Sequence, residues 1–162
     1  MTIHEKSRSN PLDRLVGTWT TEATHPGRPG VIVHGTTVVT WLEGERFLSL
    51  LSSNDHPDFP GALSVIGDMG HDRGGGSEGT GQTNDDESQL RMHYYDSRGV
   101  FRICEVGIDD AAWRVWRKAP GFSQRFTGEF SENHTTIAGR WELCRDDIHW
   151  EDDLQITYRR QG

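Results

Sequence analysis

The chain has 162 residues, a length that suits one domain with one hydrophobic core. Its 17 basic and 25 acidic residues give a net charge of −8, which disfavours a nucleic-acid partner because phosphate contacts need Lys and Arg. Only 33% of the residues are hydrophobic and 19 are Gly. That composition favours strands joined by tight turns over a helical bundle.

The sequence also carries expectations about cell compartment and partners. No apolar run approaches the roughly 20 residues that cross a bilayer, and the polar start MTIHEKSRSNP lacks the apolar region of a signal peptide. Two cysteines, Cys104 and Cys144, do not make a disulfide framework. We therefore expect a reduced, cytoplasmic protein without a membrane or nucleic-acid partner, as a monomer or a homodimer.

Along the chain, residues 1–10 predict a disordered lead, and residues 11–162 predict one domain. Asn10 and Pro11 predict a short helical turn, because Asn caps helices and Pro suits the first helical position. Alternating apolar residues then predict strands, and no stretch keeps a helical period. The ten strands are expected near 17–24, 32–42, 45–53, 62–69, 88–96, 99–108, 111–117, 122–130, 135–144 and 149–159.

The links between these strands are short, so sequential strands must be antiparallel neighbours. About ten strands in such a meander are too many for a flat sheet, and closure removes both unpaired edges. The fold class predicted is all-β, a single antiparallel up-and-down β-barrel of about ten strands with a short N-terminal helical turn.

One segment interrupts the alternation. Residues 71–88, HDRGGGSEGTGQTNDDES, predict a flexible Gly-rich loop, with a lid over the barrel mouth as the alternative. The segment holds a formal G-x-G-x-x-G at Gly74, Gly76 and Gly79. A dinucleotide site is excluded, because no helical pattern follows and the next residues are acidic.

Alternation predicts which side chains point into the barrel. Trp19 lies on the inner face of the first strand, where an Arg of the last strand is expected to stack on it. Other strands contribute an aromatic wall. The inward set comprises Trp113, Val115, Arg117, Phe122, Gln124, Phe126, Phe130, Ile137, Trp141, Leu143, Trp150, Leu154, Ile156 and Tyr158.

The stretch YDSRGV at 95–100 predicts a hairpin. A three-residue loop pairs Tyr94 with Arg102 and turns both inward together with Cys104, whereas a two-residue loop would turn Glu105 inward. Either register puts an ionisable group inside the barrel. A buried charge is costly alone, so it needs a protein carboxylate or a ligand anion, and for Arg102 both alternatives stay open.

Several phrases of the chain resemble a known family. They are Gly17-Thr18-Trp19, TWLEGERFL (40–48), YYDSRGVFR (94–102), FSQRFTG (122–128) and GRWELC…WEDDLQITYRR (139–160). Together they resemble uncharacterised bacterial lipocalin-like domains of the calycin type. The resemblance implies a lipocalin-like barrel and no particular activity, because the functions of that family are largely unassigned.

The haem-binding nitrobindins are more distant relatives of the same barrel type, with an axial His in the last strand ahead of an Arg. If Arg160 matches that Arg, the His position falls near Asp153, which disfavours haem. Haem is therefore a third hypothesis, and no other cofactor is expected. No Cys/His set fits zinc and no Asp/Glu spacing fits calcium, so no metal site is predicted.

The leading functional hypothesis is binding of a hydrophobic or aromatic small molecule inside the barrel. The alternative is a cofactor-independent enzyme of specialised metabolism, a cyclase, isomerase or hydratase, that uses the same pocket. A purely structural or partner-binding domain, which predicts a filled barrel with no cavity, is a fourth hypothesis. Catalytic candidates are His25, His71 and Tyr94, and the residues expected to bind the ligand are Arg102, Tyr94, Trp41, Trp113, Arg117, Gln124, Phe126, Trp141 and Tyr158.

Overall fold

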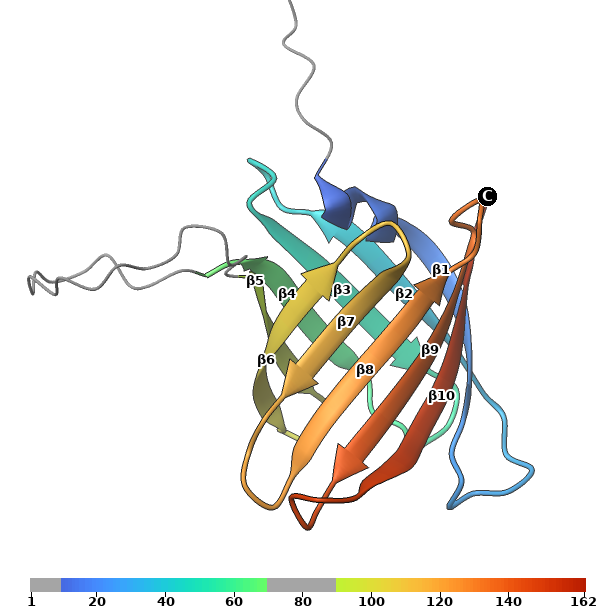
Figure 1. Cartoon of the computed structure of the whole chain (residues 1–162). Helices are drawn as coiled ribbons and strands as arrows, with labels where there is room; N and C mark the ends of the chain where they lie inside the picture. The colour runs from blue at the N-terminus through green and yellow to red at the C-terminus, as the bar shows by residue number, and fades with distance from the viewer. Residues whose placement is uncertain (1–9, 70–89) are drawn as a thin grey trace, which may run out of the picture.

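The computed structural model describes residues 10–69 and 90–162, which form a closed barrel of ten antiparallel strands (Figure 1). Each strand pairs with its neighbours in sequence, and the first strand pairs with the last. This confirms the predicted all-β up-and-down barrel. The elements are η1 (Pro11–Leu15), β1 (Gly17–Thr24), β2 (Val33–Trp41), β3 (Phe47–Asn54), β4 (Ala62–Asp68), β5 (Leu90–Asp96), β6 (Phe101–Ile108), β7 (Ala112–Arg117), β8 (Ser123–Phe130), β9 (Thr136–Cys144) and β10 (Trp150–Arg160).

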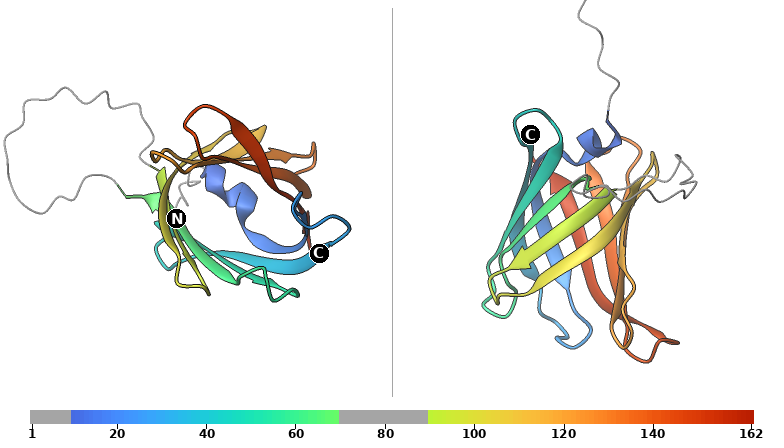
Figure 2. Two further views of the ribbon diagram at one scale, coloured as in Figure 1. Left: turned by 90° about the horizontal axis from the view of Figure 1, so that it is seen from below. Right: turned by 90° about the vertical axis from the view of Figure 1, so that its left-hand side faces the viewer.

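The short helix η1 closes one end of the barrel. The predicted cap is confirmed: the Asn10 side chain accepts a hydrogen bond of 3.0 Å from the backbone N–H of Leu12, and Pro11 opens the helix. Leu12 and Leu15 are buried in the core. Figure 2, seen from below, shows η1 lying across the far opening of the barrel. The helix therefore fills this end instead of leaving a channel.

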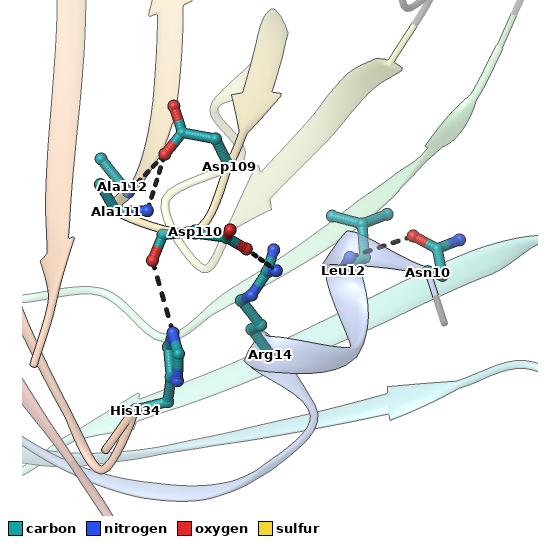
Figure 3. A network of polar contacts seen from close by, with 8 residues as sticks. All are labelled: Asn10, Leu12, Arg14, Asp109, Asp110, Ala111, Ala112 and His134. Atoms are coloured by element: carbon teal, nitrogen blue, oxygen red, sulfur yellow. Dashed lines mark hydrogen bonds and ion pairs between the residues drawn. The ribbon is translucent and has the colours of Figure 1, made fainter. Parts of the chain in front are cut away.

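Polar contacts hold η1 to the rim of the barrel. Arg14 forms an ion pair with Asp110, which lies in the turn between β6 and β7 (Figure 3). A ring nitrogen of His134 lies 3.4 Å from the backbone oxygen of Asp110, so the β8–β9 turn joins the same network. Trp41 of β2 donates from Nε1 to Asp13 at 2.8 Å. These contacts bring three separate parts of the rim onto one turn of helix.

Trp19 of β1 plugs the barrel beneath η1. It is buried, and its Nε1 donates to the carbonyl of Leu15 at 2.9 Å. Arg160 of β10 lies with Cζ 4.2 Å from the centre of the indole ring, which confirms the expected stacking of a last-strand Arg. The same guanidinium donates to the carbonyls of Arg14 and Val16. One side chain thus joins the last strand to the plug and to the chain that leaves η1.

The Gly of the Gly-Thr-Trp triplet has a geometric role. Gly17 has a positive φ of 139°, and a Cβ placed there would come 2.7 Å from Nη1 of Arg160. A larger residue would therefore push the guanidinium away from its carbonyl partners. The triplet is explained by the arginine that it accommodates.

A β-bulge in β10 corrects one sequence prediction. Asp152 pairs with Glu142 and Leu154 pairs with Trp141, so Asp153 is an extra residue between two pairs. An inserted residue changes the face on which the following side chains lie. The prediction that Trp150 points inward is wrong: its side chain is exposed and its ring stacks outside the barrel under Arg125, at 4.0 Å.

Two predicted segments fall outside the described residues. The first is the loop at 71–88, which includes His71. The second is the N-terminal lead, of which only the last residue, Asn10, is described, as the cap of η1. Asp68 and Leu90, the strand ends on either side of the loop, pair with each other at the η1 end of the barrel. Within residues 10–69 and 90–162, no helix has the length and hydropathy to cross a bilayer.

We predict that Arg160→Gln lowers the free energy of unfolding by about 2 to 3 kcal/mol, because carbonyls at the plugged end lose a charged donor. Urea unfolding followed by tryptophan fluorescence measures the change. The exposed neighbour Arg159 provides the matched control, and Arg159→Gln is expected to stay within about 0.5 kcal/mol of the wild type. Equal effects of the two variants would contradict the assigned role.

Candidate functional site

The barrel encloses a cavity of about 580 Å³, which opens at the end opposite η1. Cavities of this size hold small organic ligands in other proteins. Side chains from the connecting loops and strand ends form the mouth. These mouth residues are His25, Arg28, Asp58, Arg98, Phe122 and Arg145.

Opposite walls of the cavity differ in side-chain size. Strands β7 to β10 contribute an aromatic wall whose ring centres lie 4.9 Å apart for Trp113 and Phe126, and 5.1 Å apart for Phe126 and Trp141. Most of the lining residues on the facing strands β1 to β4 are small, although Leu50 and Asn54 of β3 also line the cavity. The small wall comprises Thr21, Thr37, Ser52, Ala62 and Ser64.

The hairpin between β5 and β6 places the central polar residues. Asp96 N–H donates to the carbonyl of Val100 at 3.0 Å, and Tyr94 pairs with Arg102. Gly99 has a φ of 82°, the left-handed conformation that the predicted turn requires. This confirms the three-residue loop, and with it the inward position of Tyr94 and Arg102, both of which line the cavity. Glu105 points outward and is exposed.

The Asp96 carboxylate organises this hairpin. Its side chain is fully buried and accepts hydrogen bonds from the Tyr94 hydroxyl at 2.9 Å and from Arg98 Nη2 at 2.7 Å. The backbone N–H groups of Arg98 and Val100 also donate to it. The bond from Arg98, helped by those from Tyr94 and the backbone, lowers the pKa of Asp96 to about 2.

The same contact defines what Tyr94 can do. Burial, together with the hydrogen bond to ionised Asp96, raises the pKa of Tyr94 to about 12. The phenol therefore stays protonated at neutral pH, and its proton points at Asp96. Tyr94 has an oxygen free to accept a hydrogen bond, but it is a poor source of a proton for catalysis.

Arg102 differs from the other arginines around the cavity. Arg28 pairs with Asp58 at 2.7 Å, and Arg98 and Arg145 likewise have carboxylate partners, at 2.7 and 3.9 Å. Arg102 lies with Cζ 5.3 Å from the centre of the Phe122 ring. In the described part of the chain, no carboxylate pairs with it.

His25 lies at the mouth with both ring nitrogens engaged. Its Nδ1 accepts a hydrogen bond of 2.9 Å from the N–H of Gly27, so Nε2 carries the proton and donates to Asp153 at 2.9 Å. A neutral imidazole in this arrangement has no lone pair free for a substrate. Sequence reasoning missed the pair, because 128 positions separate the two residues and a bulge turns Asp153 inward.

The remaining predicted ligand residues divide into two groups. The following line the cavity: Trp113, Gln124, Phe126, Trp141 and Tyr158. Trp41 and Arg117 are not among the lining residues: Trp41 bonds Asp13 beside η1, and Arg117 Nη1 donates to the carbonyl of Phe122 at 3.1 Å.

Three lining groups bear on possible chemistry. Burial raises the pKa of the Tyr158 hydroxyl and of the Cys104 thiol, so both stay protonated at neutral pH. The Nε1 of Trp113 is a buried donor that has no hydrogen-bond partner among residues 10–69 and 90–162. Across those same residues, no group of three or more His, Cys, Asp or Glu side chains could hold a metal ion.

Comparison with known proteins supports the fold. No protein-family model matches the chain, and no curated protein matches it. Among solved structures, the crystal structure of Rv2717c from M. tuberculosis is similar, with a TM-score of 0.60 and 9% sequence identity. The match covers 95% of this chain and 99% of that one. At this identity the similarity shows the barrel architecture alone.

The buried Asp96 predicts a dependence of stability on pH. Its pKa of about 2 lies below the ordinary 3.8, so ionised Asp96 stabilises the fold above about pH 4 and this contribution is lost as the pH falls towards 2. We expect Asp96→Asn to lower the free energy of unfolding by about 2 kcal/mol at pH 7. Urea unfolding of both proteins between pH 7 and about pH 2 should show the difference shrinking.

Asp58 supplies the comparison, because its ion pair with Arg28 is half-exposed. Asp58→Asn is expected to change the free energy of unfolding by less than about 0.5 kcal/mol at every pH. A difference between wild type and Asp96→Asn that stays constant down to pH 2 would contradict the role given to Asp96.

Proposed function

We propose that this barrel binds a hydrophobic or aromatic small molecule in its cavity. The observation that carries the proposal is the facing of two unlike walls, aromatic on β7 to β10 and small on β1 to β4, around about 580 Å³ of space. Aromatic rings supply apolar contact area, and a few polar groups, Arg102 and Gln124 among them, supply orientation.

The cavity favours this proposal over a structural barrel. A barrel that serves only as a scaffold is expected to fill its interior with side chains. Here Thr37, Ser52 and Ser64 are small residues although they line the cavity. Small inward residues on four successive strands are costly for packing, and a ligand would restore those contacts.

The polar groups favour a binding protein over an enzyme. Tyr94 directs its proton at Asp96, and His25 uses both ring nitrogens within the protein. A general acid or base needs a proton or a lone pair within reach of the substrate. Both described catalytic candidates are engaged elsewhere, whereas the lining residues suit retention of an apolar molecule.

We also propose that the chain is a lipocalin-like domain. The phrases that carry the resemblance coincide with structural devices of the barrel: Gly17 and Trp19 meet Arg160 at the plug, and YYDSRGVFR forms the β5–β6 hairpin. The nitrobindin comparison puts Asp153 where an axial His is expected. Because Asp153 accepts the proton of His25, this position does not favour haem.

The neutral fluorescent probe N-phenylnaphthylamine tests the proposal, because its emission rises when it leaves water for an apolar site. We expect the wild type to bind it and Ser64→Phe, which fills the small wall, to weaken binding by at least about tenfold. Leu63→Phe, on the outer face of the same strand, is the matched control and should bind as the wild type does. Equal binding by all three proteins would show that the probe does not enter the cavity.

A further inference from the structure

We infer that the ligand of this cavity carries an anionic group, a carboxylate or equivalent oxyanion, that binds the guanidinium of Arg102. The inference rests on the proposed function and names the chemical class of the ligand. The ion pairs around the cavity support it, in addition to the apolar contacts that the walls offer a ligand.

The arginines that line the cavity differ in their ion pairs. Each of Arg28, Arg98 and Arg145 has a carboxylate within 4 Å, and Arg102 has none among the described residues. The two acids that line the cavity, Asp58 and Asp153, already contact Arg28 and His25. Asp96, in the hairpin turn, already binds Arg98 and Tyr94. Among the arginines that line the cavity, Arg102 is therefore the one without a carboxylate partner in the described residues.

The unpaired charge of Arg102 carries a cost in free energy. Arg102 is partly buried, and a partly desolvated cation is destabilised unless an anion or several acceptors compensate it. Phe122 covers one face of the guanidinium and supplies only a modest attraction. Stacking uses the face of the group and leaves its N–H donors, which lie in the plane, for a planar oxyanion.

Other polar side chains of the cavity accompany Arg102. Tyr94 lies directly opposite in the strand pairing, and its phenol oxygen retains lone pairs after donating its proton to Asp96. Gln124 lines the same cavity two residues beyond Phe122. An oxyanion on Arg102 can accept from the Gln124 amide, and a neighbouring ligand hydroxyl can donate to Tyr94.

The positions of Arg102 and Trp113 along the barrel define an orientation for the ligand. Arg102 is the second residue of β6 and lies near the mouth, whereas Trp113 is the second residue of β7 and lies towards the η1 end. Phe126 and Tyr158 surround Trp113. An aromatic acid fits this layout with its ring system against the deep aromatic wall and its charged group near the solvent.

Two probes with the same aromatic skeleton test the inference. Anilinonaphthalene sulfonate is N-phenylnaphthylamine with an added sulfonate, so the ratio of their affinities isolates the contribution of the anion. We expect the wild type to favour the anionic probe by at least about tenfold, and Arg102→Gln to bring the ratio of the two affinities close to one. The ratio cancels any effect of the substitution that is common to both probes. Arg102→Lys should retain part of the preference, because the charge stays and the planar fork is lost.

Arg28→Gln is the matched control, because it removes the same charge from the same cavity at a residue that is already paired with Asp58. It should keep the wild-type preference. An equal loss in both variants would overturn the inference, because general electrostatics would then explain it. Unchanged preference in Arg102→Gln would also overturn it.

A measurement on the wild type alone guards against a variant that does not fold. Naphthoic acid should displace the neutral probe at a concentration at least about tenfold lower than its uncharged amide does. Equal displacement would overturn the inference and leave the proposed function standing. If the neutral probe itself fails to bind the cavity, the proposed function and the inference both fall.

Discussion

The pairing of β1 with β10 is the constraint on which the rest of the structure depends. Without it, the meander would have two exposed edges and no interior. Arg160 lies at the end of this seam, opposite Trp19 in the pairing, and binds the carbonyls of the chain that leaves η1. Arg160 therefore takes part both in closing the sheet and in closing one end of it. The result is a barrel with one sealed end and one mouth.

Side-chain volume then decides what the sealed barrel contains. On β7 to β10, the aromatic rings pack in edge-to-face and tilted contacts. Gly139 leaves room for Phe126, because a Cβ at this position would come within 2.6 Å of that ring. On β2 to β4, Val39, Leu48 and Ile66 fill the η1 end, whereas mostly small residues line the cavity towards the mouth. The cavity thus results from two sets of inward-facing strand positions, one with large side chains and one with small side chains. No particular loop is needed to form it.

Local chemistry made much of this predictable. Strand positions follow from alternation, and the β5–β6 register follows from Asp96 and Gly99 within one turn. Long-range features could not be read in the same way: the extra residue at Asp153 changed the face of Trp150, and the contact of Asp153 with His25 joins opposite ends of the chain. Alternation identified the aromatic wall, but the open space appears only when the small residues of four strands are brought opposite it.

The two ends of the barrel also differ in what a substitution would disturb. Residues of the sealed end make contacts that span the whole chain, so a change there disturbs the closure itself. The mouth is built from hairpin loops and strand ends, and surface loops tolerate substitution better than a packed end does. Substitutions in the mouth loops can therefore change which ligand the cavity accepts, while the sealed end that closes the barrel stays the same.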